Sequence, residues 1–228
     1  MDDFQWYATT PALAQRAWAT FKNRDFSLVL DSSAGNGDLG DHSPWAEDPY
    51  GHRGHTPRID CCEIDISRHP TLRAKNFNVI GFDFLQMQSA VHYRHIIMNA
   101  PFNEGARHVL KAWDLMFDGE IVAIINAETV RNPFSEERKR LAKLINEHGG
   151  VEFIANAFSG PDAQRKTDVE VALVYLCKKA DTSSIVGDLF KDLREDAANA
   201  QTLAQDYQEQ CEVALPNSMI ENTVLAFS

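Results

Sequence analysis

Short apolar runs recur along the chain and are separated by polar or helical stretches. The runs at residues 27–30 and 95–98 consist almost entirely of Val, Leu, Ile and Met. Strands that are buried on both faces need such near-continuous apolar sequences, which are typical of parallel sheets covered by helices. The pattern therefore predicts an α/β domain with a doubly wound, largely parallel sheet. The predicted strands are residues 27–30, 59–64, 79–82, 95–98, 121–125, 153–158 and 169–177.

Helices are predicted where apolar side chains recur at helical spacing between these runs. They cover residues 11–21, 104–117 and 135–148. Pro11 suits the first turn of the first helix, and glycines follow the ends of the other two, at Gly119 and at Gly149-Gly150. The last two predicted strands follow one another across residues 159–168, which predicts a hairpin that closes an edge of the sheet.

The length of 228 residues suffices for one well-buried α/β domain and an appendage. From Asp181 onward the composition changes to Asp, Ala, Gln and Glu with little apolar periodicity. We therefore predict one domain over residues 1–180 and a mostly helical C-terminal extension over residues 181–228.

The net charge of −11 argues against a free-standing nucleic-acid binder. Lys and Arg side chains that neutralise phosphates supply most non-specific affinity for nucleic acids, so any contact with DNA is expected to be local or to depend on a partner. The basic side chains of residues 138–143 are interpreted as a solvated helix face. The N-terminus lacks a secretion signal and no apolar run approaches the ~18 residues that span a bilayer, so we expect a cytoplasmic protein without a membrane segment.

The four cysteines and eight histidines show no Cys-x-x-Cys or His-x-x-x-His spacing. Neither a metal site nor a disulfide framework is therefore predicted. The polar insertion at residues 40–58, which holds three of these histidines, is predicted to be a long surface loop near a ligand site.

A glycine-containing turn, Asp31-Ser32-Ser33-Ala34-Gly35-Asn36-Gly37, directly follows the first apolar run. Its glycines allow the backbone to approach a ligand closely. Glu63, at the tip of the second strand, can accept hydrogen bonds from two ribose hydroxyls. Asp83 and Phe84 follow the third strand, where a carboxylate can hold an adenine amino group and an aromatic ring can pack on the adenine. The chain has neither a phosphate-binding loop nor the three-glycine dinucleotide motif, so a cofactor with ribose and adenine but no phosphates fits best, and S-adenosylmethionine is the candidate.

A second motif, Asn99-Ala100-Pro101-Phe102, closes the run at residues 95–98. Together with the cofactor turn it resembles class I S-adenosylmethionine-dependent methyltransferases, specifically the amino-group DNA methyltransferases of bacteria and bacteriophages that modify adenine. The resemblance covers roughly residues 4–178. It implies a Rossmann-like fold, with a mainly parallel seven-stranded sheet, an antiparallel last strand and helices on both faces.

The resemblance also implies site residues. An N-terminal aromatic–Thr–Pro segment, which covers the cofactor in this family, is similar to residues 6–11. In the catalytic tetrapeptide, the Asn99 side-chain carbonyl and the Ala100 backbone carbonyl accept hydrogen bonds from the target amine, and Phe102 stacks on the extruded base. Those bonds draw the nitrogen lone pair out of conjugation, so that it attacks the sulfonium methyl group without a strong general base. The implied cofactor-binding residues are Tyr7, Thr10, Asp31, Ser33, Ala34, Gly35, Gly37, Glu63, Ile64, Asp83, Phe84 and Asn99, and the implied catalytic residues are Asn99, Ala100, Pro101 and Phe102.

Ala100 departs from the family pattern, which has a proline at this position. Ala100 still supplies a backbone carbonyl but lacks the fixed φ of proline. We therefore expect a less pre-organised turn. If the site is active, Ala100→Pro should react faster; if the protein is a binding module that has lost its chemistry, the substitution should restore little.

The function that the resemblance implies is methylation of N6 of adenine in DNA, as in restriction-modification systems or in bacteriophages that protect their DNA. Similar Asn-Pro-Pro-aromatic motifs act on guanine amino groups of RNA and on glutamine side chains of proteins, and a non-catalytic binding protein is a further alternative. Arg165 and Lys166 lie between the last two strands, where they suit either phosphate contacts or an ordinary solvated hairpin. No target-recognition module is evident, so a protein partner that supplies sequence recognition is expected.

Overall fold

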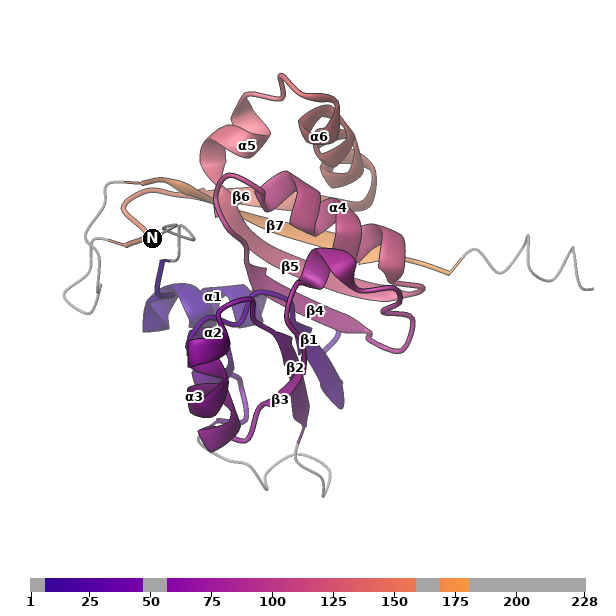
Figure 1. The fold of residues 1–228 in the computed structure, drawn as a ribbon. Coiled ribbons are helices and arrows are strands. Elements are labelled where there is room, and N and C mark those ends of the chain that lie inside the picture. Colours follow the sequence, from indigo (N-terminus) through magenta and orange to yellow (C-terminus); the bar gives the residue numbers. More distant parts are fainter. Residues whose placement is uncertain (1–6, 47–56, 159–168, 181–228) are drawn as a thin grey trace, which may run out of the picture. The chain divides into compact units, whose positions relative to one another are not determined.

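A seven-stranded sheet lies at the centre of the structure, in the strand order β3-β2-β1-β4-β5-β7-β6 (Figure 1). The computed structural model describes residues 7–46, 57–158 and 169–180. The strands are β1 (Leu28–Asp31), β2 (Arg58–Cys62), β3 (Asn78–Gly81), β4 (His95–Asn99), β5 (Gly119–Asn126), β6 (Gly149–Ile154) and β7 (Val171–Lys178).

Strands β1 to β5 are parallel to one another, whereas β7 is antiparallel to both β5 and β6. The chain starts at β1, builds outward to β3 and then returns to β4 on the other side of β1, so the strand order reverses between β1 and β4. Ligands bind at such a reversal, outside the carboxyl ends of the strands, in open α/β sheets. The predicted Rossmann-like fold with a mainly parallel sheet is confirmed, as is the hairpin of the last two strands at one edge.

Helices cover both faces of the sheet, α1 to α3 on one side and α4 to α6 on the other (Figure 1). They are α1 (Pro11–Thr20), α2 (Asp38–Asp41), α3 (His69–Ala74), α4 (Gly105–Leu115), α5 (Ala127–Arg131) and α6 (Glu136–His148), with two short 3-10 turns at Ile66–Arg68 and Phe84–Gln86. None of the helices in the described part of the chain is both long and apolar enough to cross a bilayer.

The side chains of β4 explain why its sequence is continuously apolar. Ile96 and Met98 belong to the hydrophobic cluster beneath α4 and α6, whereas Ile97 belongs to the cluster around Trp18 of α1. Successive side chains of a strand point to opposite faces, so a strand between two helical layers needs apolar residues at every position.

The strand β6 begins earlier in the sequence than predicted. Residues 153–158 were expected to form the strand, but it begins at Gly149, directly after α6. The two glycines were interpreted as a break after the helix. Gly149 instead approaches β7 so closely that an added Cβ would lie 1.8 Å from the carbonyl oxygen of Tyr175, which only glycine permits.

The polar insertion is not entirely a loop. Its first two residues, 40 and 41, end α2, and the ring of Trp45 contacts that of Trp18, with centroids 5.1 Å apart. Residues 47–56 lie outside the described residues, as does the predicted extension over residues 181–228, whose helical character stays a prediction.

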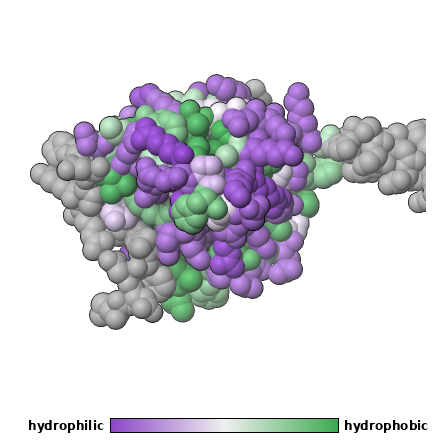
Figure 2. Space-filling model, turned by 90° about the horizontal axis from the view of Figure 1, so that it is seen from above, coloured by the Kyte–Doolittle hydropathy of each residue, from purple (hydrophilic) through white to green (hydrophobic). Residues whose placement is uncertain are grey.

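The charged face of α6 is neutralised by local ion pairs. Arg140 pairs with Asp114 of α4, and Lys139 pairs with Glu136 one turn away. The surface above these helices is largely hydrophilic, interrupted by small apolar patches (Figure 2). This pairing agrees with the interpretation of these side chains as a solvated face.

Candidate active site

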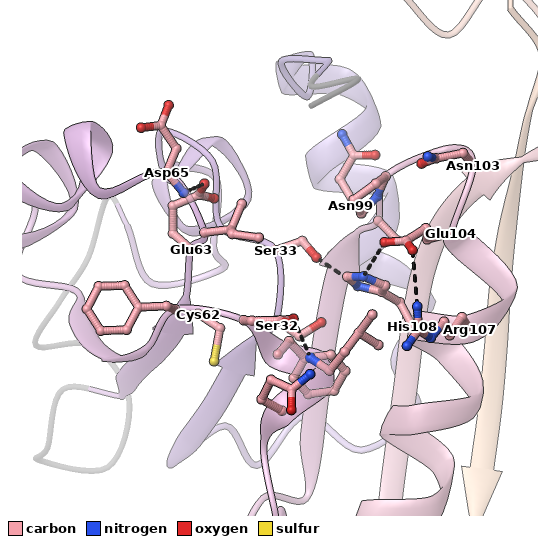
Figure 3. A pocket seen from close by; sticks show the side chains of 18 of the residues that line it. Ser32, Ser33, Cys62, Glu63, Asp65, Asn99, Asn103, Glu104, Arg107 and His108 are labelled. Carbon is pink, nitrogen blue, oxygen red and sulfur yellow. Dashed lines mark hydrogen bonds and ion pairs between the residues drawn. The ribbon is translucent and has the colours of Figure 1, made fainter. Parts of the chain in front are cut away.

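A cavity of about 580 Å³ opens at the carboxyl ends of β1, β2, β3 and β4 (Figure 3). Its walls come from the turn after β1, the tip of β2, the loop after β3, the tip of β4 and the first turns of α4. This is the reversal point of the strand order, and the volume lies in the range of small-molecule and cofactor sites. Of the predicted site residues, those that line this cavity are Tyr7, Ser33, Glu63, Ile64, Asp83, Phe84, Asn99, Ala100 and Pro101.

The turn after β1 holds a buried carboxylate. Asp31 is 2% exposed and accepts a hydrogen bond from the backbone N–H of Ser33 at 3.2 Å. The pKa of Asp31 is raised to about 7, mainly by burial and also by the negative charges of Glu63 and Asp38, while the hydrogen bond from Ser33 opposes the shift. A cationic group placed near this turn would stabilise the ionised form of Asp31.

Gly37 ends the turn and needs to be glycine for two reasons. Its φ of 85° lies in the left-handed region, and an added Cβ would lie 2.6 Å from the ring of Phe77. The turn therefore packs directly on the layer formed by α3 and the following residues. Ala34 and Gly35 were also predicted to bind the cofactor, but they do not line the cavity.

Glu63 connects this turn to the tip of β2. Its Oε2 accepts a hydrogen bond from the N–H of Gly35 at 2.7 Å, and its Oε1 accepts one from the N–H of Asp65 at 2.8 Å. Burial raises the pKa of Glu63, while these two hydrogen bonds oppose that effect. Each oxygen keeps a second acceptor position, so a carboxylate fixed in this way can bind two neighbouring hydroxyl groups.

The polar groups of the cavity fit a cofactor with hydroxyl groups and no phosphates. The Ser32 hydroxyl lines the cavity and is the one buried side-chain polar atom, among the described residues, without a hydrogen-bond partner. Such an atom needs a partner, which a ligand can supply. Four acidic side chains line the cavity together with two basic ones, so the lining is net negative and disfavours a phosphate; they are Glu63, Asp65, Asp83 and Glu104, and Arg68 and Arg107.

Asn99 is held at the tip of β4 by the N-terminal segment. Its Nδ2 donates to the carbonyl oxygen of Tyr7 at 2.9 Å and to Oγ1 of Thr9 at 3.0 Å. Both amide hydrogens are thus used within the protein, and the side-chain carbonyl oxygen of Asn99 is left as an acceptor beside the cavity. Figure 3 shows this side chain at the edge of the cavity.

The threonine that contacts Asn99 is Thr9, whereas Thr10 is the one predicted from the sequence to bind the cofactor. Thr10 instead precedes α1, and its hydroxyl donates to the carbonyl oxygen of Ala157 at 3.4 Å. The backbone N–H of Thr9 donates to Oδ2 of Asp38 at 3.2 Å, which fixes the segment on α2. The Thr9-Thr10 pair offered two registers, and the sequence alone did not distinguish them.

Ala100 is fixed by a backbone hydrogen bond. Its N–H donates to the carbonyl oxygen of Ile124 in β5 at 3.2 Å, and the residue is 2% exposed. A proline at this position has no N–H and would leave that carbonyl without its donor. We therefore no longer expect Ala100→Pro to improve the turn. In this chain the hydrogen bond from Ala100 to Ile124 restricts the backbone, as the fixed φ of a proline would.

Phe102 does not line the cavity as the structure describes it. Its ring is 8% exposed and stacks on the ring of Tyr7, with centroids 4.7 Å apart and an angle of 19° between the planes. Phe158 completes the cluster, 5.4 Å from Tyr7 and 5.9 Å from Phe102. Stacking of Phe102 on a substrate base stays a prediction. Arg165 and Lys166, the predicted phosphate contacts, lie outside the described residues.

Comparisons place this arrangement among known folds. No protein-family model matches the sequence, and no curated protein matches it. A "putative RNA methyltransferase" from Pyrococcus horikoshii superposes with a TM-score of 0.53 at 18% identity, over 79% of this chain and 89% of that chain. A type I restriction-modification methyltransferase subunit from Streptococcus thermophilus gives 0.56 at 13% identity, over 78% of this chain and 46% of that chain. A dimethyladenosine transferase from Plasmodium falciparum gives 0.52 at 15% identity, over 78% of this chain and 64% of that chain.

The chain has the class I methyltransferase fold. At these identities the likeness concerns the fold alone. Within this methyltransferase fold, the cavity lies at the edge of the sheet where β1 and β4 end.

One further residue of the cavity lining, a histidine, was not predicted from the sequence. His108, on α4, is buried, and its Nδ1 lies 3.4 Å from Oγ of Ser33 (Figure 3). Its Nε2 lies 3.9 Å from Glu104 of the same helix. Burial lowers the pKa of His108, so the imidazole is neutral at neutral pH. The signal in the sequence was the pair Glu104 and His108, one helical turn apart directly after the tetrapeptide. Within the described ranges, no group of His, Cys, Asp and Glu side chains is arranged to hold a metal ion.

Proposed function

We propose that this chain transfers a methyl group from S-adenosylmethionine to the exocyclic amino group, N6, of adenine in DNA. The observation that supports it most strongly is the orientation of Asn99. Because Tyr7 and Thr9 take both amide hydrogens, the Asn99 carbonyl oxygen is available to accept a hydrogen bond from an amine in the cavity. The backbone carbonyl of Ala100, the next residue, provides a second acceptor.

The residues around the cavity suit this cofactor. Glu63 would bind the ribose hydroxyls, Asp83 the adenine amino group, and the unpartnered Ser32 hydroxyl a polar atom of the amino-acid end. Asp31, beneath the turn, would stabilise a cationic ligand. When bound, S-adenosylmethionine supplies a methyl group on a positively charged sulfur, which is electrophilic.

The remaining chemistry depends on how the chain holds the amine. Two hydrogen bonds, to Oδ1 of Asn99 and to the Ala100 carbonyl oxygen, orient the amine hydrogens and turn its lone pair away from the conjugated ring. With S-adenosylmethionine bound, a new N–C bond to the methyl group would form as the sulfur–methyl bond breaks, and the amine would release one proton to solvent. The turn between β4 and α4, which the Ala100 N–H bonds to β5, would position the acceptors before substrate binds and so lower the entropy cost of reaching the reactive geometry.

DNA recognition by this chain is proposed to need a partner. The net charge of −11 leaves little general attraction for phosphates. The chain spans less than half of the Streptococcus thermophilus protein, which is named as the methyltransferase subunit of a type I restriction-modification system. A second protein that reads the target sequence would fit both facts, with Arg165 and Lys166 as local phosphate contacts.

Methylation of RNA is the second candidate, since two of the similar structures are named for RNA methylation or for dimethyladenosine formation. The test measures transfer of labelled methyl groups from S-adenosylmethionine to double-stranded DNA, single-stranded DNA, RNA and a glutamine-containing peptide. Labelled N6-methyladenine in DNA is the expected product. If the folded protein does not bind S-adenosylmethionine in calorimetry, the proposal is wrong.

Asn99→Ala should lower methyl transfer by at least about 100-fold, since it removes an acceptor placed for the reacting amine. The affinity for S-adenosylmethionine should stay within about threefold. The matched control is Asn132→Ala, an exposed asparagine after α5, which should behave like the wild type. A large fall in melting temperature for Asn99→Ala without a specific loss of turnover would assign Asn99 a purely structural role.

A further inference from the structure

The ring of Tyr7 covers Phe102 on the side of the cavity. Tyr7 lines the cavity and Phe102 does not, and the two rings are stacked with centroids 4.7 Å apart. Phe102 is only 8% exposed as a result of its contacts with Tyr7 and Phe158. The position on Phe102 that a substrate ring would occupy is therefore filled by a ring of the protein itself.

The backbone of Tyr7 has a different task. Its carbonyl oxygen accepts a hydrogen bond from Nδ2 of Asn99 at 2.9 Å, and Thr9 provides the second bond. Rotation about the Cα–Cβ bond of Tyr7 moves the ring without moving this carbonyl. The contact that orients Asn99 and the contact that covers Phe102 can thus be separated.

We propose that the Tyr7 ring occupies the acceptor position on Phe102 in the absence of substrate, and that a planar acceptor ring displaces it before methyl transfer. This inference rests on the proposed function and narrows its substrate class. A nucleobase recovers the stacking that is lost when Tyr7 moves, because it presents a flat ring of similar width. A glutamine side chain has no ring and recovers none, so the exchange favours nucleobases over protein amides.

Substitution of Tyr7 tests the exchange directly. Tyr7→Ala removes the competing ring but keeps the backbone carbonyl, whereas Tyr7→Phe keeps a ring of the same shape and is the matched control. Each protein, loaded with S-adenosylhomocysteine, is titrated with a single-stranded oligonucleotide that carries one 2-aminopurine, whose fluorescence falls on stacking. Tyr7→Ala should bind it about 2- to 10-fold more tightly than the wild type, the size expected for one aromatic pair, and Tyr7→Phe, which keeps the stacked ring, should gain less than Tyr7→Ala.

Several results would overturn the inference. Unchanged or weaker binding by Tyr7→Ala, absence of 2-aminopurine quenching, or equal gains for Tyr7→Phe would each contradict a competing ring. A parallel gain for a glutamine peptide would contradict the preference for nucleobases. If Tyr7→Ala fails to fold, Tyr7→Leu removes the flat ring, keeps apolar cover over Phe102, and should give the same direction of change. Calorimetry with S-adenosylmethionine distinguishes a failure of the proposed function from a failure of this inference. If no variant binds the cofactor, the proposed function is wrong. If the variants bind the cofactor normally and the oligonucleotide affinity does not change, only the role of Tyr7 is wrong.

Discussion

Ala100→Pro should destabilise the protein and should not accelerate methyl transfer, although proline is the residue that the family pattern has at this position. The substitution removes the N–H that donates to the Ile124 carbonyl, and Ile124 is fully buried in β5. A buried carbonyl without its donor costs about 1–3 kcal/mol. The smaller conformational entropy of the unfolded chain returns about 0.4–1 kcal/mol. The expected net loss is about 1–2 kcal/mol, which lowers the melting temperature of a chain of this size by about 2–8 °C.

Scanning calorimetry measures the stability change, and single-turnover methyl transfer measures the effect on the reaction. Affinity for S-adenosylmethionine is the internal control, since Glu63 and its two donors are untouched and the dissociation constant should stay within about threefold. Hydrogen exchange of the Ala100 amide in the wild-type protein should be slow, as expected for an N–H bonded to a buried strand. A variant that melts at or above the wild-type temperature and reacts faster would refute this reasoning and restore the argument from a fixed φ.

Two further predictions concern the cofactor turn. Glu63→Gln places an amide NH₂ against one of two backbone N–H donors, so the affinity for S-adenosylmethionine should fall by roughly tenfold or more in calorimetry, about 1–3 kcal/mol. The control, Glu137→Gln on the exposed face of α6, should leave the affinity unchanged. Equal effects of both substitutions would show that the loss of one negative charge, and not the position of Glu63, weakens binding. The pKa of Asp31 is raised to about 7, above its value in the unfolded chain, so the folded state retains a proton between pH 4 and 7 that the unfolded state releases. The free energy of unfolding of the wild type should therefore decline, relative to that of Asp31→Asn, as the pH rises through this range, and parallel stability curves would contradict the assignment. Because a cationic ligand favours the ionised carboxylate, affinity for S-adenosylmethionine should rise between pH 6 and 8 in the wild type and less so in Asp31→Asn.

The strands of this protein were predictable because both faces of the sheet are covered. In β4 every position from Ile96 to Met98 meets a helix or a neighbouring strand, and this requirement is visible as a continuous apolar sequence. The start of β6 was not predictable in the same way. Gly149 signals a helix end by its type, but the carbonyl oxygen of Tyr175, far away in the sequence, makes it a strand residue.

The cavity could be predicted because its residues follow strands. Glu63 and Asn99 each come at the carboxyl end of a parallel strand, and such ends meet at one edge of the sheet. Thr9 and His108 were missed because their roles depend on long-range contacts, with Asn99 and with Ser33 respectively. The burial of Phe102 under Tyr7 could not be predicted from local sequence patterns either, because the two residues are 95 positions apart.

The position of β7 has a consequence for how this chain is made. Although β7 follows β6 and is the last strand in the described part of the chain, it lies between β5 and β6 and pairs with both of them. During synthesis, the growing polypeptide therefore exposes one side of β5, a strand whose residues 121–125 are fully buried in the finished protein, until residue 178 has been added. An unpaired apolar strand edge is a template for aggregation. Prematurely terminated chains that lack β7 should consequently be recovered in inclusion bodies or with chaperones, and the domain is expected to gain resistance to proteolysis in one late step when β7 enters the gap.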